Sequence, residues 1–181
     1  MQKIFFLLIL NVFIFFFSFN SYSFKEVYRP TSIIAKDSTE IVVARCISSE
    51  VKLDEKTGFV FTYTTFEVDK TVKNTLDTDK VELRIVGGQA GDIRTGVEGV
   101  PKFDVQEEMV LFLGPKNKLG YYTLSSFTNG IYKVDIDETT GRKIIKNPPN
   151  DLNVPNTNLK EITSGNSMLL EDFISSLKQN I

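Results

Sequence analysis

Alternation of apolar and polar residues with a period of two is the feature that most constrains the fold of this chain. It is clearest in residues 80–86, where Val81, Leu83 and Ile85 share one face. Because successive side chains of a strand point to opposite faces, this pattern predicts a strand with one face in a core. Related patterns predict further strands over residues 40–47, 59–68, 109–113, 121–124, 130–135 and 142–145.

Two segments between these strands share the pattern Asp-Glu-x-Thr-Gly. They are Asp54–Gly58 and Asp137–Gly141. A glycine at the end of such a segment supplies the positive φ of a hairpin closed by a bulge. Closely spaced strands joined by turns of this kind predict a mainly β fold, either an antiparallel barrel or a sandwich.

The N-terminus has the pattern of an export signal. Lys3 precedes the apolar run of residues 4–19, and Ser21-Tyr22-Ser23 places small residues where a signal peptidase cleaves. The run is shorter than the ~20 residues of a membrane-spanning helix, although Phe24 extends it, so an uncleaved anchor is the alternative. We therefore predict a signal peptide over residues 1–23 and a protein exported to the periplasm or the medium.

The remaining residues suit one domain followed by a helix. We predict a β-barrel domain over residues 24–146 and a linker over residues 147–158, which contains prolines and asparagines. Apolar residues at helical spacing then predict an amphipathic helix within residues 159–181 that packs on the barrel, with Ser167 as its N-cap.

Charge and composition exclude several classes of partner. The whole chain has 21 basic and 23 acidic residues, and Lys3 is the only charged residue in the predicted leader. The mature chain is therefore slightly acidic. Without a basic cluster the chain does not resemble a nucleic-acid-binding protein, and no segment is a basic amphipathic helix for a membrane surface. We expect a monomer, without membrane contact after cleavage, that binds an unknown protein.

The absence of histidine bears most directly on activity. The chain has no histidine and one cysteine, Cys46, which excludes Ser-His-Asp and Cys-His nucleophilic pairs, the usual zinc sites and an intramolecular disulfide. Cys46 shares an apolar strand face with Val42 and Ala44, which predicts a buried thiol. Neighbours on a strand point to opposite faces, so Glu107 and Glu108 cannot act together as acid and base. We predict a non-catalytic protein without a metal or cofactor.

Two other groups of residues have competing interpretations. Asp135-Ile136-Asp137-Glu138 offers calcium-type oxygens, but it lacks the alternate ligands and distal glutamate of an EF-hand loop, and hairpin closure is favoured. Tyr121-Tyr122 suggests a stacking platform for sugars or bases, although adjacent tyrosines on a strand face opposite ways.

The stretch RIVGGQAGDIRTGVEGVPKF, residues 84–103, holds five of the eleven glycines. Gly91 and Gly96 have the spacing of a phosphate-binding loop, but Val97 stands where that loop requires lysine. The segment is therefore predicted to be a long connection, flexible or folded on itself, and connections of this length are usually functional. The predicted partner-binding residues are Arg94, Glu98 and Phe103. The alternative is a loop that only covers an open barrel end.

Several of these segments together resemble a poorly characterised group of exported bacterial proteins. The shared features are the strand at residues 40–47, the strand at residues 63–68, Gly87-Gly88, Gly99-Val100-Pro101-Lys102-Phe103, and Glu107-Glu108 before Val-Leu-Phe-Leu. Gln106 stands where that group usually has glycine. Residues 37–73 also resemble the netrin-like domain of tissue inhibitors of metalloproteinases, which implies an OB-type barrel, closed or partly open. Those inhibitors chelate zinc through an N-terminal cysteine, whereas the mature chain would begin at Phe24.

Three functions follow as expectations. The first is an exported binding module that contacts a protein through residues 87–103. The second is an inhibitor or accessory factor of an exported protease that occludes a cleft without chelating metal. The third is binding of carbohydrate or another component of the cell envelope.

Overall fold

The computed structural model describes residues 29–181 apart from residues 75, 77, 98, 150 and 153–165. The elements run in the order α2 (Thr31–Asp37), β1 (Glu40–Leu53), β2 (Val60–Lys73), β3 (Lys80–Val86), β4 (Gly88–Ala90), β5 (Ile93–Thr95), β6 (Glu108–Gly114), β7 (Thr123–Leu124), the 3-10 helix η1 (Phe127–Gly130), β8 (Ile131–Ile136), β9 (Lys143–Lys146), β10 (Ser167–Leu169) and α3 (Leu170–Asn180).

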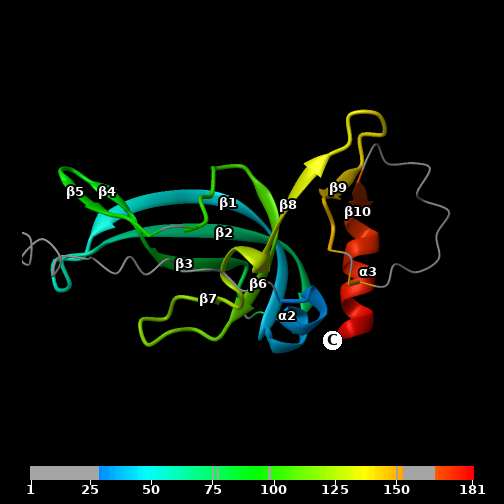
Figure 1. Ribbon diagram of the computed structural model, residues 1–181, viewed down its shortest axis with the longest axis horizontal. Coiled ribbons are helices and arrows are strands. Elements are labelled where there is room, and N and C mark those ends of the chain that lie inside the picture. Colours follow the sequence, from blue (N-terminus) through cyan, green and yellow to red (C-terminus); the bar gives the residue numbers. More distant parts are fainter. Residues whose placement is uncertain (1–28, 75, 77, 98, 150, 153–165) are drawn as a thin grey trace, which may run out of the picture.

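One antiparallel sheet organises the described residues. Its strand order is β10-β9-β8-β6-β1-β2-β3, with β7 paired to β6, and β4 and β5 form a separate two-stranded sheet. An isolated parallel bridge joins Leu83 of β3 to Tyr122, just before β7. Figure 1 shows β1 and β2 as a long ribbon, with the β4–β5 hairpin at one end of the molecule and the helices at the other.

Strand β6 and the first half of β1 are strongly apolar and buried on both faces, so two cores form. Ile41 and Val43 of β1 point into a first core that the two helices cover. Val42, Ala44 and Cys46 alternate with them and point into a second core. In β1 the pairing with β2 shifts between Cys46 and Ser48, so a bulge separates the apolar half of the strand from its polar half.

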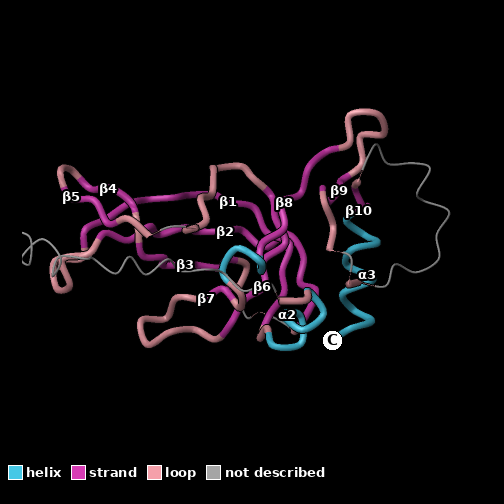
Figure 2. Tube along the Cα trace, in the orientation of Figure 1, coloured by secondary structure: helices cyan, strands magenta, loops and turns pink. Residues whose placement is uncertain are grey.

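The first core is closed by side chains from both helices. Ile34 of α2 and Phe173, Ile174 and Leu177 of α3 belong to it. Tyr132 lies between Phe112 and Phe173, with ring centroids 5.7 Å and 4.9 Å away. Figure 2 shows α2 and α3 at the same end of the molecule.

The prediction of a mainly β fold with a C-terminal helix is confirmed. The predicted N-cap at Ser167 is wrong, because Ser167 belongs to β10 and pairs with Lys146, and α3 begins three residues later. Residues 1–23, where the signal peptide is predicted, and most of the predicted linker lie outside the described residues. Among the described residues, no helix is both long enough and apolar enough to cross a membrane.

Candidate functional site

The glycine-rich segment folds back on the ends of β1 and β2 rather than crossing open space. The Gly87 N–H donates to the Val60 carbonyl (2.9 Å), and the Thr62 hydroxyl donates to the Gly87 carbonyl (2.9 Å). The Val60 N–H donates to Thr95 Oγ1 (2.8 Å). These three bonds hold both strands of the β4–β5 hairpin against β2, so its position is defined.

Close approach explains why glycine is required where the hairpin begins. Gly87 and Gly88 have φ of 128° and 127°, which side-chain-bearing residues rarely adopt. A Cβ on Gly88 would lie 2.6 Å from Val51 Cγ1. The glycines therefore serve backbone geometry at this turn.

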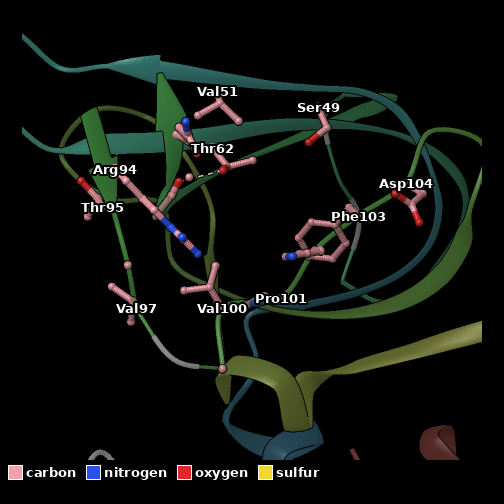
Figure 3. Close-up of a pocket in the computed structure, with 16 residues that line it drawn as sticks. Ser49, Val51, Thr62, Arg94, Thr95, Val97, Val100, Pro101, Phe103 and Asp104 are labelled. Atoms are coloured by element: carbon pink, nitrogen blue, oxygen red, sulfur yellow. Dashed lines mark hydrogen bonds between the residues drawn. The ribbon is translucent and has the colours of Figure 1, made fainter. Parts of the chain in front are cut away.

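The hairpin and the returning chain enclose a pocket of about 630 Å³. We call it the loop pocket. It is lined by Ser49, Val51, Thr62, Gly87, Gly88, Gln89, Arg94, Thr95, Gly96, Val97, Gly99, Val100, Pro101, Lys102, Phe103 and Asp104. Figure 3 shows the β4–β5 strands on one side and the segment from Val100 to Asp104 on the other. The volume is in the range of small-ligand pockets, ~300–1,000 Å³.

Arg94 carries a charge at the centre of this pocket. Figure 3 shows its side chain extending from β5 toward the middle of the space. The residue is exposed, and within the described part of the chain no hydrogen bond or ion pair engages its guanidinium. Lys102 and Asp104 also line the pocket, so these three side chains together carry one net positive charge.

The apolar side chains of the pocket come from both of its walls. Val97 is 43% exposed, whereas Val100 is half-buried and Phe103 is only 6% exposed. The Phe103 ring meets Phe66 edge to face, with centroids 5.1 Å apart, and belongs to the second core. Phe103 thus anchors the returning chain while still lining the pocket.

The structure therefore brings together two of the three predicted partner-binding residues. Arg94 and Phe103 line the same pocket. Glu98 lies outside the described residues. Sequence analysis did not identify Lys102, Val51 or Thr62 as part of this site. Their inclusion depends on the hairpin reaching back to β1 and β2, which no local pattern encodes.

The paired carboxylates after the pocket have separate structural partners. Glu108 is buried and lies between Arg45 (3.2 Å) and Lys143 (2.7 Å). Glu107 forms an ion pair with Lys133 and accepts the Asp104 N–H. The hydrogen bond from Lys133, followed by that N–H, lowers the pKa of Glu107 against the opposing effect of burial. The two carboxylates thus hold the sheet and the pocket rim and do not converge on one point.

Gln106, where the resembling group usually has glycine, keeps a glycine-like backbone. Its φ is 78°. The Gln106 N–H donates to the Cys46 carbonyl (2.8 Å), and the Cys46 N–H donates to the Glu107 carbonyl (2.8 Å). The turn is therefore fixed by β1 at the cost of local strain.

Cys46 lies under this turn. The residue is fully buried with a free thiol, which confirms the sequence prediction. Burial, and then the nearby Glu107 carboxylate, raise the pKa of the thiol.

The acidic stretch near residue 137 closes a hairpin. Asp137 Oδ1 accepts the Thr139 N–H (3.1 Å), the Thr140 N–H (2.8 Å) and the Thr140 hydroxyl (2.9 Å). Asp54 accepts the N–H groups of Lys56 and Thr57 in the same way. Gly58 and Gly141 have φ of 72° and 68°, which confirms the predicted role of both glycines. No group of three or more His, Cys, Asp or Glu side chains in the described residues is placed to hold a metal ion.

The adjacent tyrosines diverge as their alternation predicts. Tyr122 is buried in the second core, whereas Tyr121 packs edge-on against Tyr63, with centroids 5.6 Å apart. The outer face of β1 to β3 continues with Arg84, whose guanidinium lies 3.4 Å from the centroid of Phe61. A small pocket of about 180 Å³ lies beside Tyr63 and Tyr121.

Comparison of the chain with protein-family models, with curated proteins and with solved structures found no match. Inferences about function therefore depend on the geometry of the loop pocket and on the composition of the chain.

Proposed function

We propose that this chain is an exported, non-catalytic binding module that contacts a protein partner through residues 87–103. The observation that carries the proposal is the loop pocket, a space of about 630 Å³ between two anchored segments, into which Arg94 extends without a hydrogen-bond or ion-pair partner among the described residues. A loop that only sealed the sheet would be expected to fill this space with its own apolar side chains and pair its charge.

Composition supports a binding role over a catalytic one. The chain contains no histidine, and its adjacent carboxylates Glu107 and Glu108 each have their own cationic partners. Its described lining residues supply hydroxyls, one carboxylate and two cations, a set suited to recognition.

Capture of the partner from native exported extract tests the proposal. The bait is the exported protein, either unchanged or with Arg94→Ala and Glu98→Ala. The matched control replaces Glu138 and Arg142 at the β8–β9 turn, which are exposed and, like the first pair, opposite in charge and four residues apart in the sequence. We expect the first double variant to keep its melting temperature and lose the partner, and the control to retain it. Equal capture by both variants would show that the binding surface lies elsewhere.

We also propose that the strands around the second core form an OB-type barrel. The support is the parallel bridge between Leu83 and Tyr122, where the Tyr122 N–H donates to the Glu82 carbonyl (2.9 Å). This contact links β3 to the segment leading into β7, and β7 pairs with β6, giving the cyclic order β1-β2-β3-β7-β6. Amide exchange tests it: the Tyr122 N–H should be as protected as the β2–β3 amides, and rapid exchange there would indicate an open sheet.

Occlusion of a protease cleft is a more specific version of the binding role. The β4–β5 hairpin lies at one end of the molecule in Figure 1; Ile93 on it is 44% exposed, and Val97, two residues after β5, is 43% exposed. An exposed apolar hairpin of this kind suits insertion into a cleft. Inhibition of exported proteases that disappears on replacing Ile93 and Val97 by serine would support this role.

Carbohydrate binding has one favourable observation of its own. Tyr63 and Tyr121 flank the small pocket on the outer face, together with Glu50, Lys52 and Glu82. Aromatic rings beside carboxylates can hold sugars. Retention on cell-envelope glycans that is lost in Tyr121→Ala, and kept in the Arg94 variant, would favour this function over the first.

A further inference from the structure

The charge and shape of the loop pocket indicate what part of a partner it would hold. We infer that the pocket takes a peptide carboxylate with an adjacent apolar side chain. This inference rests on the proposed binding function and names the chemistry recognised at the same site.

The charge of the pocket fits a single negative charge. Arg94 extends into the space without an ion-pair partner in the described residues. Lys102 lines the same pocket from the returning chain. Asp104, also on the lining, offsets one of these two cations. The net charge of one on these three side chains, counted over the described lining of the pocket, matches a carboxylate, whereas a doubly charged phosphate would remain incompletely neutralised. A planar guanidinium also binds carboxylate oxygens in pairs.

The walls of the pocket fit an apolar side chain next to that charge. Val51 of β1 lies on one side of the space, and Val97, Val100 and Phe103 lie along its other sides. Val51 and Val97 are 41% and 43% exposed, so they have apolar area that a partner can cover. Burial of that area would strengthen the ion pair by excluding water from it.

The anchoring of both walls means that the pocket exists before the partner binds. The hydrogen bonds of Gly87 and Thr95 to Val60 fix the hairpin, and the ring contact of Phe103 with Phe66 fixes the returning chain. A preformed site loses less conformational freedom on binding, so even a short peptide should bind measurably.

Two pairs of blocked peptides test the inference by calorimetric titration of the purified exported protein. The first pair is acetyl-Leu-Val with a free C-terminal carboxylate and the same peptide amidated. The second is acetyl-Leu-Glu-Val-amide and its Gln counterpart. We expect the charged member of at least one pair to bind about tenfold or more tightly than its neutral partner. The pair that discriminates identifies the source of the carboxylate, a chain terminus or an acidic side chain.

Variants separate the pocket from nonspecific attraction. Arg94→Gln should abolish the discrimination, whereas Arg142→Gln, an exposed arginine at the β8–β9 turn, should preserve it. Equal binding of charged and neutral peptides, or discrimination that survives Arg94→Gln, would overturn the inference. If partner capture still depends on residues 87–103 in that case, the binding function stands and only the carboxylate assignment fails.

Discussion

The two ends of the sheet differ in how completely their apolar surface is covered. At the helix end, α2 and α3 cover the first core, and Phe173 and Leu177 are fully buried. At the hairpin end, the chain returns over the second core but encloses the loop pocket, with Val97 left exposed. Helices supply long side chains at regular spacing, whereas a glycine-rich segment supplies few, so only the first end can be completely filled.

This difference assigns stability and recognition to separate regions. Lys73 Nζ donates to the Ala35 and Lys36 carbonyls (2.8 Å each) and so ties β2 to the last turn of α2, while Tyr132 bonds Thr31 through their hydroxyls (2.7 Å). These bonds join the sheet to α2 beside the first core. At the hairpin end, Arg94 extends into the loop pocket and has no hydrogen-bond or ion-pair partner among the described residues.

The largest expected effect is at the helix end. Phe173→Ala removes a fully buried ring that contacts Tyr132, and it should lower the free energy of unfolding by about 3–5 kcal/mol. Val97→Ala at the hairpin end should change it by less than about 0.5 kcal/mol. Denaturant unfolding measures both variants. If both variants lost a similar free energy of unfolding, the helix end would not contribute more to stability than the hairpin end.

A smaller loss is expected where the hairpin leaves β3. Gly88→Ala places a Cβ 2.6 Å from Val51 Cγ1 at a φ of 127°, and should cost about 1–3 kcal/mol. Gly96→Ala is the control, because nothing lies within 4 Å of its Cβ and its φ is not positive. Thermal unfolding should separate the two variants. Equal stability would mean that the hairpin is not held against β1.

The strained turn at the base of the pocket predicts a stabilising change. Gln106→Gly removes the strain of a side-chain-bearing residue at φ 78°, but it also increases the conformational entropy of the unfolded chain. The free energy of unfolding should rise by a net amount of about 0.5–1 kcal/mol. Gln106→Ala retains a Cβ and should give no gain. Chemical denaturation of both variants checks this. A loss of stability in the glycine variant would show that the Gln106 side chain itself stabilises the turn.

The smallest effect is a pH dependence at the pocket rim. Glu107 has a lowered pKa in the folded protein, so its contribution is complete above the ordinary carboxyl range and is lost as the pH falls through the lowered value. The ion pair with Lys133 is partly exposed, so the contribution should be a few tenths of a kcal/mol. As the pH is lowered, the free energy of unfolding of Glu107→Gln should fall less steeply than that of the unchanged chain. If stability depends on pH in the same way in both proteins, Glu107 does not contribute to that dependence.

Local patterns predicted most strands because each alternates in a way that its own residues specify. The predicted strand over residues 80–86 matches β3, and the alternation of Val42, Ala44 and Cys46 matches the second core. The second half of β1, residues 48–53, was not predicted, because it is mostly exposed and polar and is stabilised by pairing with β2. Likewise β10 exists only because β9, distant in sequence, lies beside it.

The candidate site was predictable only in part, for the same physical reason. The length and glycine content of residues 87–103 predicted an unusual connection, and Arg94 was predicted to contact a partner. The pocket depends on long-range bonds, such as that from Val60 to Thr95 Oγ1, which no local pattern reports. The strain at Gln106 was visible only as a departure from an expected glycine.

Photo-crosslinking at one exposed apolar position near each end shows which end of the molecule meets the partner. A benzoylphenylalanine replaces Val97 on the hairpin side, 43% exposed, or Ile136 at the β8–β9 turn, 56% exposed. Irradiation in native exported extract should give a discrete adduct from position 97 and none from position 136. An adduct from position 136 alone, or from neither position, would contradict the assignment of recognition to the hairpin end.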